Sequence, residues 1–147
     1  MSPAERLTLT VLGCSGSYAG PGQACSGYLL QSPTTSVVLD LGPGTLANLQ
    51  RHIDPAQLDA VVLSHEHPDH WGDLPVLRNA LRYYLDREGL AVFGTTGTQD
   101  MATAVSKELS PTLDWTAIDE TAAVRVGDLT FRFSPTDHPV PTFAMRI

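Results

Sequence analysis

The order of apolar and polar side chains predicts a mixed chain of short strands and short helices. Residues 7–12 alternate between apolar and polar side chains, which is typical of a half-buried strand. The runs at 28–31 and 36–40 flank the turn sequence Ser-Pro-Thr-Thr and predict a hairpin. Residues 45–53 keep apolar side chains three or four apart, which indicates a short helix. Residues 58–63 form a short apolar run between two prolines and predict a buried strand.

The second half of the chain also predicts short helices and strands. Residues 74–85 repeat apolar side chains at helical spacing, with Asp73 expected as the N-cap and Arg78 expected on the solvated face. Met101, Val105 and Leu109 lie four apart and predict the apolar face of another helix, which is expected to stop before Pro111. Residues 123–134 alternate strictly on both sides of Gly-Asp, a dipeptide suited to a two-residue hairpin turn.

Four potential metal ligands lie within the six residues that follow the buried strand, His-Glu-His-Pro-Asp-His at 65–70. Residues two apart in an extended segment point to the same side, so His65 and His67 can bind one cation together. Pro68 disfavours helical geometry at His67, and beyond it Asp69 and His70 are offered to a second position. Imidazole and carboxylate ligands suit zinc, and also manganese or iron.

These residues carry a resemblance to a known family. Residues 61–70, Val-Val-Leu-Ser-His-Glu-His-Pro-Asp-His, resemble the signature of the metallo-β-lactamase fold. Residues 11–17 and 37–45 are similar to the ribonuclease Z-like and phosphodiesterase branch of that fold, within which bacterial cyclic-nucleotide phosphodiesterases are the nearest likeness. The resemblance implies an α/β (α+β) fold, the αββα sandwich, with residues 1–147 forming a single domain.

The resemblance also implies a site that holds two divalent metal ions, zinc first and manganese as the alternative. His65, His67 and His138 would bind one ion, and Asp69 and His70 would contribute to the other. Asp69 would also orient the attacking water, which makes it the expected catalytic residue. We also expect Asp40 to orient a metal-bound histidine. We expect the loop at 13–22 to contact a substrate phosphate through Ser15 and Ser17.

The family's bridging aspartate occurs in a Gly-Asp context after a strand. Asp128 has that dipeptide, but it lies upstream of His138 and inside a predicted turn, so the bridging role is not assigned to it. The resembled enzymes are about twice as long as this chain. We therefore expect residues 1–147 to be only the N-terminal half of the sandwich, truncated at its C-terminal end, with an exposed apolar surface that favours a homodimer.

Composition narrows the function classes. The net charge is −7, from 16 acidic and 9 basic residues, which argues against a broad nucleic-acid footprint on these residues. A small anionic substrate stays compatible with this charge, because bound metal ions invert the local field. The two cysteines form no disulfide framework, and no apolar run reaches the ~20 residues of a membrane span. We expect a cytoplasmic protein with no membrane partner.

Three functions follow as hypotheses. The first is a metal-dependent phosphodiesterase that cleaves cyclic nucleotides with a water activated by two metal ions. The second is a ribonuclease Z-like endonuclease that processes tRNA 3′ ends, which would require a basic arm for RNA beyond residue 147. The third, of a different class, is a catalytically incomplete fragment that binds metal. A lactonase or thioesterase is a further hydrolase alternative, since this fold hosts many chemistries.

Overall fold

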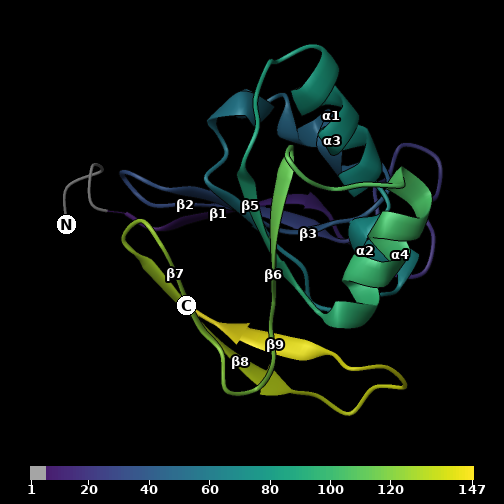
Figure 1. Cartoon of the computed structure of the whole chain (residues 1–147), viewed down its shortest axis with the longest axis vertical. Helices are drawn as coiled ribbons and strands as arrows, with labels where there is room; N and C mark the ends of the chain where they lie inside the picture. Colours follow the sequence, from purple (N-terminus) through teal and green to yellow (C-terminus); the bar gives the residue numbers. More distant parts are fainter. Residues whose placement is uncertain (1–5) are drawn as a thin grey trace.

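The structure is a computed structural model that describes residues 6–147. Figure 1 shows two sheets with helices gathered on one side. In chain order the elements are β1 (Thr8–Gly13), β2 (Gly27–Gln31), β3 (Ser36–Leu41), α1 (Thr45–Leu49), the 3-10 helix η2 (Pro55–Gln57), β4 (Ala60–Val62), α2 (Pro68–Trp71), α3 (Leu74–Tyr83), β5 (Leu90–Gly94), α4 (Thr96–Ser106), β6 (Leu113–Ala117), β7 (Ala123–Val126), β8 (Leu129–Pro135) and β9 (Phe143–Arg146).

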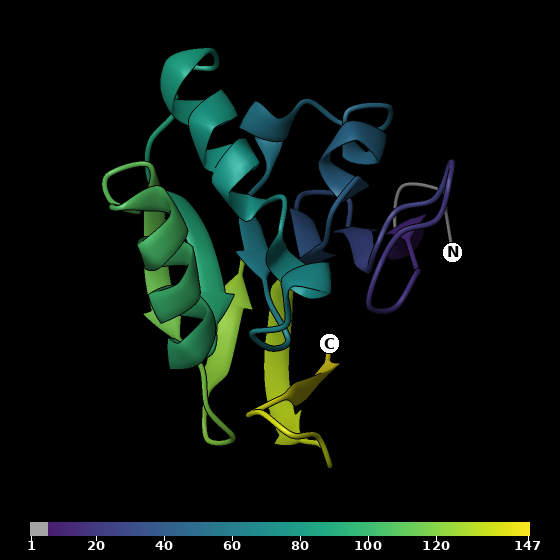
Figure 2. The same cartoon turned by 90° about the vertical axis from the view of Figure 1, so that its right-hand side faces the viewer.

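The larger sheet holds six strands in sequence order, β1 to β6. Strands β1, β2 and β3 pair antiparallel, whereas β3, β4, β5 and β6 pair parallel. The smaller sheet is the antiparallel meander β7-β8-β9, which lies across one face of the larger sheet (Figures 1 and 2). Three layers result, in the order helices, six-stranded sheet, three-stranded sheet.

The central strands are buried on both faces, as the apolar run at 58–63 predicts. Val38 and Val61 belong to the core between the sheet and the helices, together with leucines of α1 and α3. Val37 and Val62 point to the opposite face, into a second core shared with Phe131 of β8. The four valines and Phe131 have 0% exposure. The outer face of the small sheet carries exposed polar side chains, such as Thr130 and Arg132.

Most of the predicted elements are present within a residue or two, but some predicted helix faces are wrong. Met101 and Val105 are exposed, at 48% and 63%, while Thr98 and Ala102 form the buried side of α4. Helix α4 contacts α3 and β6, and its two buried residues are these smaller ones, so its larger apolar residues face outward. Leu109 is buried as predicted, but it lies beyond α4, which ends at Ser106. Arg78 is 5% exposed rather than solvated, because the segment after α4 covers it and places Glu108 Oε1 at 3.5 Å from its Nη2.

The prediction that the Asp73 side chain caps α3 is wrong. Asp73 occupies the N-cap position of α3, but its side chain makes no hydrogen bond to that helix. Asp73 Oδ2 instead accepts from the backbone N–H of Leu46, at 3.0 Å, in the first turn of α1. This contact joins two helix starts that are far apart in sequence. Helix α1 also ends at Leu49, earlier than the pattern through residue 53 indicates.

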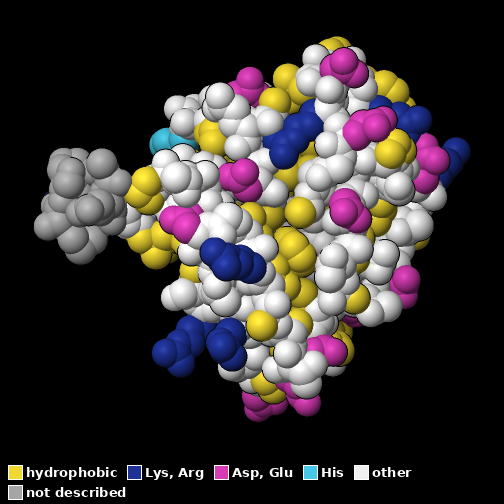
Figure 3. Space-filling view, turned by 60° about the vertical axis from the view of Figure 1, so that its left-hand side comes forward, with side chains coloured by type: hydrophobic (Ala, Val, Ile, Leu, Met, Phe, Trp, Pro, Cys, Tyr) yellow, Lys and Arg dark blue, Asp and Glu magenta, His cyan; other side chains and the backbone are white. Residues whose placement is uncertain are grey.

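An exposed apolar surface is present at the edge strand β1. Leu9 and Val11 are 56% and 57% exposed, and Leu7 beside them is 54% exposed. Figure 3 shows apolar side chains lying between basic and acidic groups on one face of the molecule. Homodimerisation through such a surface stays a prediction. None of the helices in residues 6–147 is long and apolar enough to cross a membrane.

The contact between the two sheets can be tested at Phe131, which is fully buried in the second core. We expect Phe131→Ala to lower the free energy of unfolding by about 3–5 kcal/mol, because it removes apolar contact and leaves a cavity. Urea denaturation followed by circular dichroism measures the change. Thr130→Ala on the exposed face of the same strand is the matched control and should change stability by less than about 0.5 kcal/mol. Equal effects of the two substitutions would contradict this assignment of the core.

Candidate metal centre

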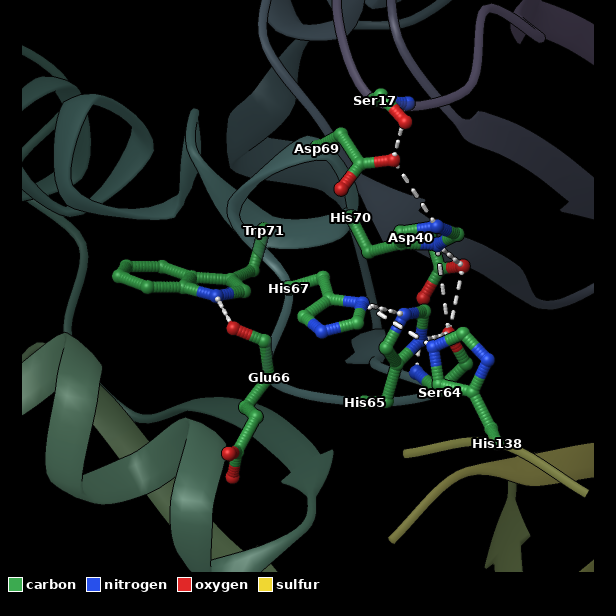
Figure 4. Close-up of polar contacts among 10 residues, drawn as sticks. All are labelled: Ser17, Asp40, Ser64, His65, Glu66, His67, Asp69, His70, Trp71 and His138. Carbon is green, nitrogen blue, oxygen red and sulfur yellow. Dashed lines mark hydrogen bonds and ion pairs between the residues drawn. The ribbon is translucent and has the colours of Figure 1, made fainter. Parts of the chain in front are cut away.

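The histidine-rich segment lies at the carboxyl edge of the parallel strands, where ligand sites of α/β sheets are usually built. Strand β4 ends at Val62, and the segment 64–70 follows it directly. The turn between β8 and β9 brings His138 to the same place from the other sheet (Figure 4). The backbone N–H of Phe143 donates to the carbonyl of Ser64 at 3.2 Å, which ties that turn to the segment after β4.

Three imidazoles converge there, as the sequence predicts for one metal position. His67 Nδ1 lies 3.2 Å from His65 Nε2 and 3.1 Å from His138 Nε2. One ring nitrogen from each residue falls within 4.8 Å of the others. His65 is buried, His67 is half-buried and His138 is exposed. Three imidazole nitrogens converging on one point fit the donor set of a divalent zinc-type ion.

Asp69 and His70 form a second pair of candidate ligands beside these three histidines. His67 has extended backbone geometry, φ −68° and ψ 134°, and Pro68 starts the short helix α2 that carries the pair. Asp69 Oδ2 lies 3.4 Å from His70 Nε2. The rings of His70 and His65 are 4.1 Å apart, so the two groups of ligands adjoin.

Asp40 is a buried aspartate that contacts Ser64 and His70 at the candidate metal centre. Asp40 is 7% exposed and has a positive φ of 55°. This conformation costs a non-glycine residue ~1–3 kcal/mol and persists only where the surroundings enforce it. The surroundings here are three hydrogen bonds. Asp40 Oδ1 accepts from the Ser64 N–H at 2.8 Å, and Oδ2 lies 2.9 Å from the Ser64 hydroxyl and 2.7 Å from His70 Nδ1. Asp40 therefore contacts a predicted metal ligand from behind, as expected for an orienting carboxylate.

Burial and neighbouring charges shift the pKa values of three candidate ligands. Burial, reinforced by the neighbouring His70, lowers the pKa of His65 to about 4, so its imidazole is neutral at pH 7. Burial alone would lower the pKa of His70, but its hydrogen bond to Asp40 and the charges of Asp40 and Asp69 outweigh that effect and raise it. Burial acts to raise the pKa of Asp69, yet the Ser17 N–H and the nearby His70 lower it overall.

The predicted substrate loop approaches this site at one of its two serines. The Ser17 backbone N–H donates to Asp69 Oδ2 at 2.8 Å, and Ser17 holds a positive φ of 63°. The Ser15 hydroxyl instead donates to Gln23 within its own loop, at 3.0 Å. Gly42 also faces Asp69, because a Cβ at position 42 would lie 1.9 Å from the Asp69 carbonyl oxygen. A role of Ser15 and Ser17 in substrate contact stays a prediction.

Sequence reasoning missed three residues that support the histidine segment. The Ser64 hydroxyl lies 2.8 Å from His65 Nδ1. Trp71 Nε1 donates to the Glu66 carbonyl at 2.7 Å, which holds the peptide between the first two histidines. The Glu66 side chain points away from the histidines and fills the space beside Gly97 at the start of α4 (Figure 4). The sequence signal for these supporting roles is that each of the three residues is a direct neighbour of a candidate ligand along the chain. Asp128 takes the turn role predicted for it and accepts hydrogen bonds from Ser32 and Thr35.

The comparison with protein families identifies the class. The model of the metallo-beta-lactamase superfamily matches residues 20–145, and the chain therefore belongs to this superfamily. An uncharacterized protein of Mycobacterium tuberculosis is 40% identical over 154 residues, covering 96% of this chain and 55% of that protein. The probable metallo-hydrolase YhfI of Bacillus subtilis is 32% identical over 145 residues, covering 96% of this chain and 59% of that protein. A ribonuclease Z of Methanopyrus kandleri is 27% identical over 144 residues, covering 97% of this chain and 50% of that protein.

Solved structures agree with this assignment. The crystal structure of the metallo-β-lactamase fold protein YhfI from Bacillus subtilis superimposes with a TM-score of 0.85 and 31% identity, covering 95% of this chain and 56% of that chain. Human tRNase Z, short form, superimposes with a TM-score of 0.72 and 19% identity, covering 93% of this chain and 62% of that chain, a likeness of fold alone. The predicted family and fold are confirmed. The chain spans between half and three-fifths of the length of these curated relatives.

The lowered pKa of His65 predicts a pH dependence of stability in the metal-free protein. Between about 4, the pKa in the folded state, and 6.5, the ordinary value, the unfolded chain binds more protons at this residue. The contribution to the free energy of unfolding is therefore fully present above pH 6.5 and is lost as pH falls through 4. His70, with its raised pKa, contributes in the opposite sense, since its stabilisation is lost as pH rises through that pKa.

Urea denaturation of chelator-treated protein across this pH range tests the His65 contribution. We expect His65→Asn to lose less stability on acidification than the unsubstituted protein. His52→Asn, which changes an exposed histidine, should follow the unsubstituted protein. An unchanged pH profile in His65→Asn would contradict the lowered pKa.

Proposed function

We propose that the protein is a metal-dependent hydrolase of phosphodiester bonds. The observation that carries the proposal is the convergence of three histidine ring nitrogens within 4.8 Å, directly beside the Asp69–His70 pair. His65, His67 and His138 would hold one divalent ion, and Asp69 and His70 would contribute to a second. Zinc suits the nitrogen-rich set best, and manganese is the alternative.

The chain's own residues prepare the site for such ions. His65 is neutral at pH 7, so no proton has to leave it before an ion binds. The ionised carboxylate of Asp69 is held in place by the Ser17 N–H at 2.8 Å and can accept a hydrogen bond from an attacking water. Divalent ions bound here would supply Lewis acidity that activates water and neutralises charge on the phosphoryl group.

A small cyclic nucleotide is the first substrate candidate. The net charge of −7 disfavours a long polyanion on this segment, whereas a single phosphodiester needs only the positive field of the bound ions. The loop at 13–22 reaches Asp69 through the Ser17 N–H. We infer that other backbone N–H groups of this loop contact a substrate phosphate. These features support a compact anionic substrate.

RNA is the second candidate, and a specific observation favours it. A ribonuclease Z is among the relatives that align over almost the whole chain, at 27% identity. Processing of tRNA 3′ ends requires phosphate contacts from basic residues, and a basic segment outside residues 1–147 would have to provide them. Hydrolysis of a cyclic nucleotide, compared with cleavage of a precursor tRNA, separates the two candidates.

Removal of a candidate ligand tests the metal assignment. We expect His138→Ala to weaken zinc binding at the three-histidine position by more than the roughly 10–100-fold that loss of an outer hydrogen-bond partner causes. Isothermal titration of chelator-treated protein with zinc measures the affinity and the stoichiometry. His52→Ala is the matched control, because His52 is exposed and lies outside the cluster. Identical titrations of both variants would exclude His138 as a ligand, and absence of zinc and manganese binding in the unsubstituted protein would refute the metal centre.

Hydrolysis should be measured on the natural full-length protein, loaded with zinc or manganese. We expect turnover of a 3′,5′-cyclic nucleotide and its loss in His67→Ala, with His52→Ala retaining activity. A precursor tRNA serves as the competing substrate. Cleavage of the tRNA alone would favour the ribonuclease candidate. Full metal loading without hydrolysis of either phosphodiester would reject the proposal and direct the panel to lactones and thioesters.

A further inference from the structure

Ser64 is the residue on which the segments of the candidate metal centre meet. It lies between the end of β4 and His65 and is half-buried. Its backbone N–H donates to Asp40 Oδ1 at 2.8 Å, and its carbonyl accepts from the Phe143 N–H at 3.2 Å. Its hydroxyl oxygen lies 2.9 Å from Asp40 Oδ2 and 2.8 Å from His65 Nδ1 (Figure 4).

Counting donors assigns the protons around this hydroxyl. An ionised carboxylate only accepts, whereas a serine hydroxyl has one proton and two lone pairs. The Ser64 hydroxyl therefore donates to Asp40 and accepts from His65 Nδ1, which must carry the imidazole proton. The reverse arrangement would bring the oxygens of Ser64 and Asp40 to 2.9 Å with no proton between them. His65 Nε2 is left as a lone pair, and it faces His67 Nδ1 at 3.2 Å in the three-histidine cluster.

Asp40 receives the same kind of contact from His70. His70 Nδ1 lies 2.7 Å from Asp40 Oδ2, so its proton also points to the carboxylate. In the neutral ring its Nε2 is then the lone pair, which lies on the side of Asp69 at 3.4 Å from Asp69 Oδ2. One carboxylate thus orients two histidines, one in each group of candidate ligands. The contact with His70 is direct, and the contact with His65 requires the Ser64 hydroxyl.

We propose that Ser64 is a positioning residue that fixes the Nδ1–H tautomer of His65 and so presents the Nε2 lone pair to a divalent metal ion. The proposal extends the proposed metal centre, but its tautomer part holds for the metal-free protein as well. The hydrogen bond made by one ring nitrogen decides which tautomer a ligating histidine adopts. Loss of the Ser64 hydroxyl removes that bond from His65 and leaves the His70 bond to Asp40 in place.

The first test is the tautomer itself, read by nitrogen-15 NMR of the chelator-treated, full-length protein with labelled histidine. The signals of His65 and His70 are assigned by their loss in His65→Asn and His70→Asn. We expect Nδ1–H at both residues in the unsubstituted protein. Ser64→Ala should shift His65 toward Nε2–H and leave His70 unchanged. Ser64→Thr retains a hydroxyl and should keep His65 as Nδ1–H, while Ser134→Ala is the matched control at an exposed serine.

Either of two results overturns the proposal: an Nε2–H tautomer at His65 in the unsubstituted protein, or an unchanged Nδ1–H tautomer in Ser64→Ala. The first result needs no substitution at Ser64, so the proposal stays falsifiable even if Ser64→Ala does not fold.

Zinc titration supplies the second readout. We expect Ser64→Ala to weaken binding at the three-histidine position by about 10–100-fold, the usual effect of losing an outer hydrogen-bond partner, with Ser64→Thr restoring most of the affinity. Unchanged zinc affinity in Ser64→Ala would overturn the positioning role. No zinc binding in the unsubstituted protein, together with the expected tautomers, would instead refute the metal centre and leave the tautomer assignment supported.

Discussion

Two-sided burial of the parallel strands β3 and β4 is the constraint from which the rest of the structure follows. Val37 and Val62 face the small sheet, while Val38 and Val61 face the helices, and all four are fully buried. A strand in this position has no solvent face, so its polar chemistry must lie at its end, as Asp40 does in β3, or beyond it. The histidine segment begins two residues after β4, where the apolar layers stop and ligand donors can meet solvent.

The packing of the small sheet against the large sheet brings the third histidine to the site. Phe131 and Phe133 on β8 fill the core between the sheets, and the next turn carries His138. An apolar contact thereby brings His138 Nε2 to within 3.1 Å of His67 Nδ1, although the two residues are 71 positions apart. Apolar burial is non-directional, so a local bond has to set the final register. The hydrogen bond between Phe143 and Ser64 does so at the edge of the site.

Buried polar groups at this edge form hydrogen bonds with one another. Asp40 would be costly to bury alone, but Ser64 and His70 provide its donors. The positive φ of Asp40 is tolerated because these bonds and the surrounding core enforce it. The hydrogen bonds of Asp40 and Ser64 orient the histidine rings without water as a partner. A metal-dependent hydrolase requires ligands that are oriented in this way.

Local patterns in the sequence were sufficient for most strands and for the β7–β8 hairpin, because alternation and turn chemistry act between near neighbours, but they did not predict β6. Ligand spacing marked the segment 65–70, whose role in metal binding stays a prediction. Local patterns failed for Arg78, Met101 and Asp73, whose surroundings come from other elements: Glu108 after α4, the contacts of α4 with α3 and β6, and the first turn of α1. Resemblance to a family pointed to His138 and Asp40, which spacing alone could not relate to the motif. Only the tertiary structure decided that Ser64 contacts both Asp40 and His65, because hydrogen-bond partners depend on distances across the fold rather than along the chain.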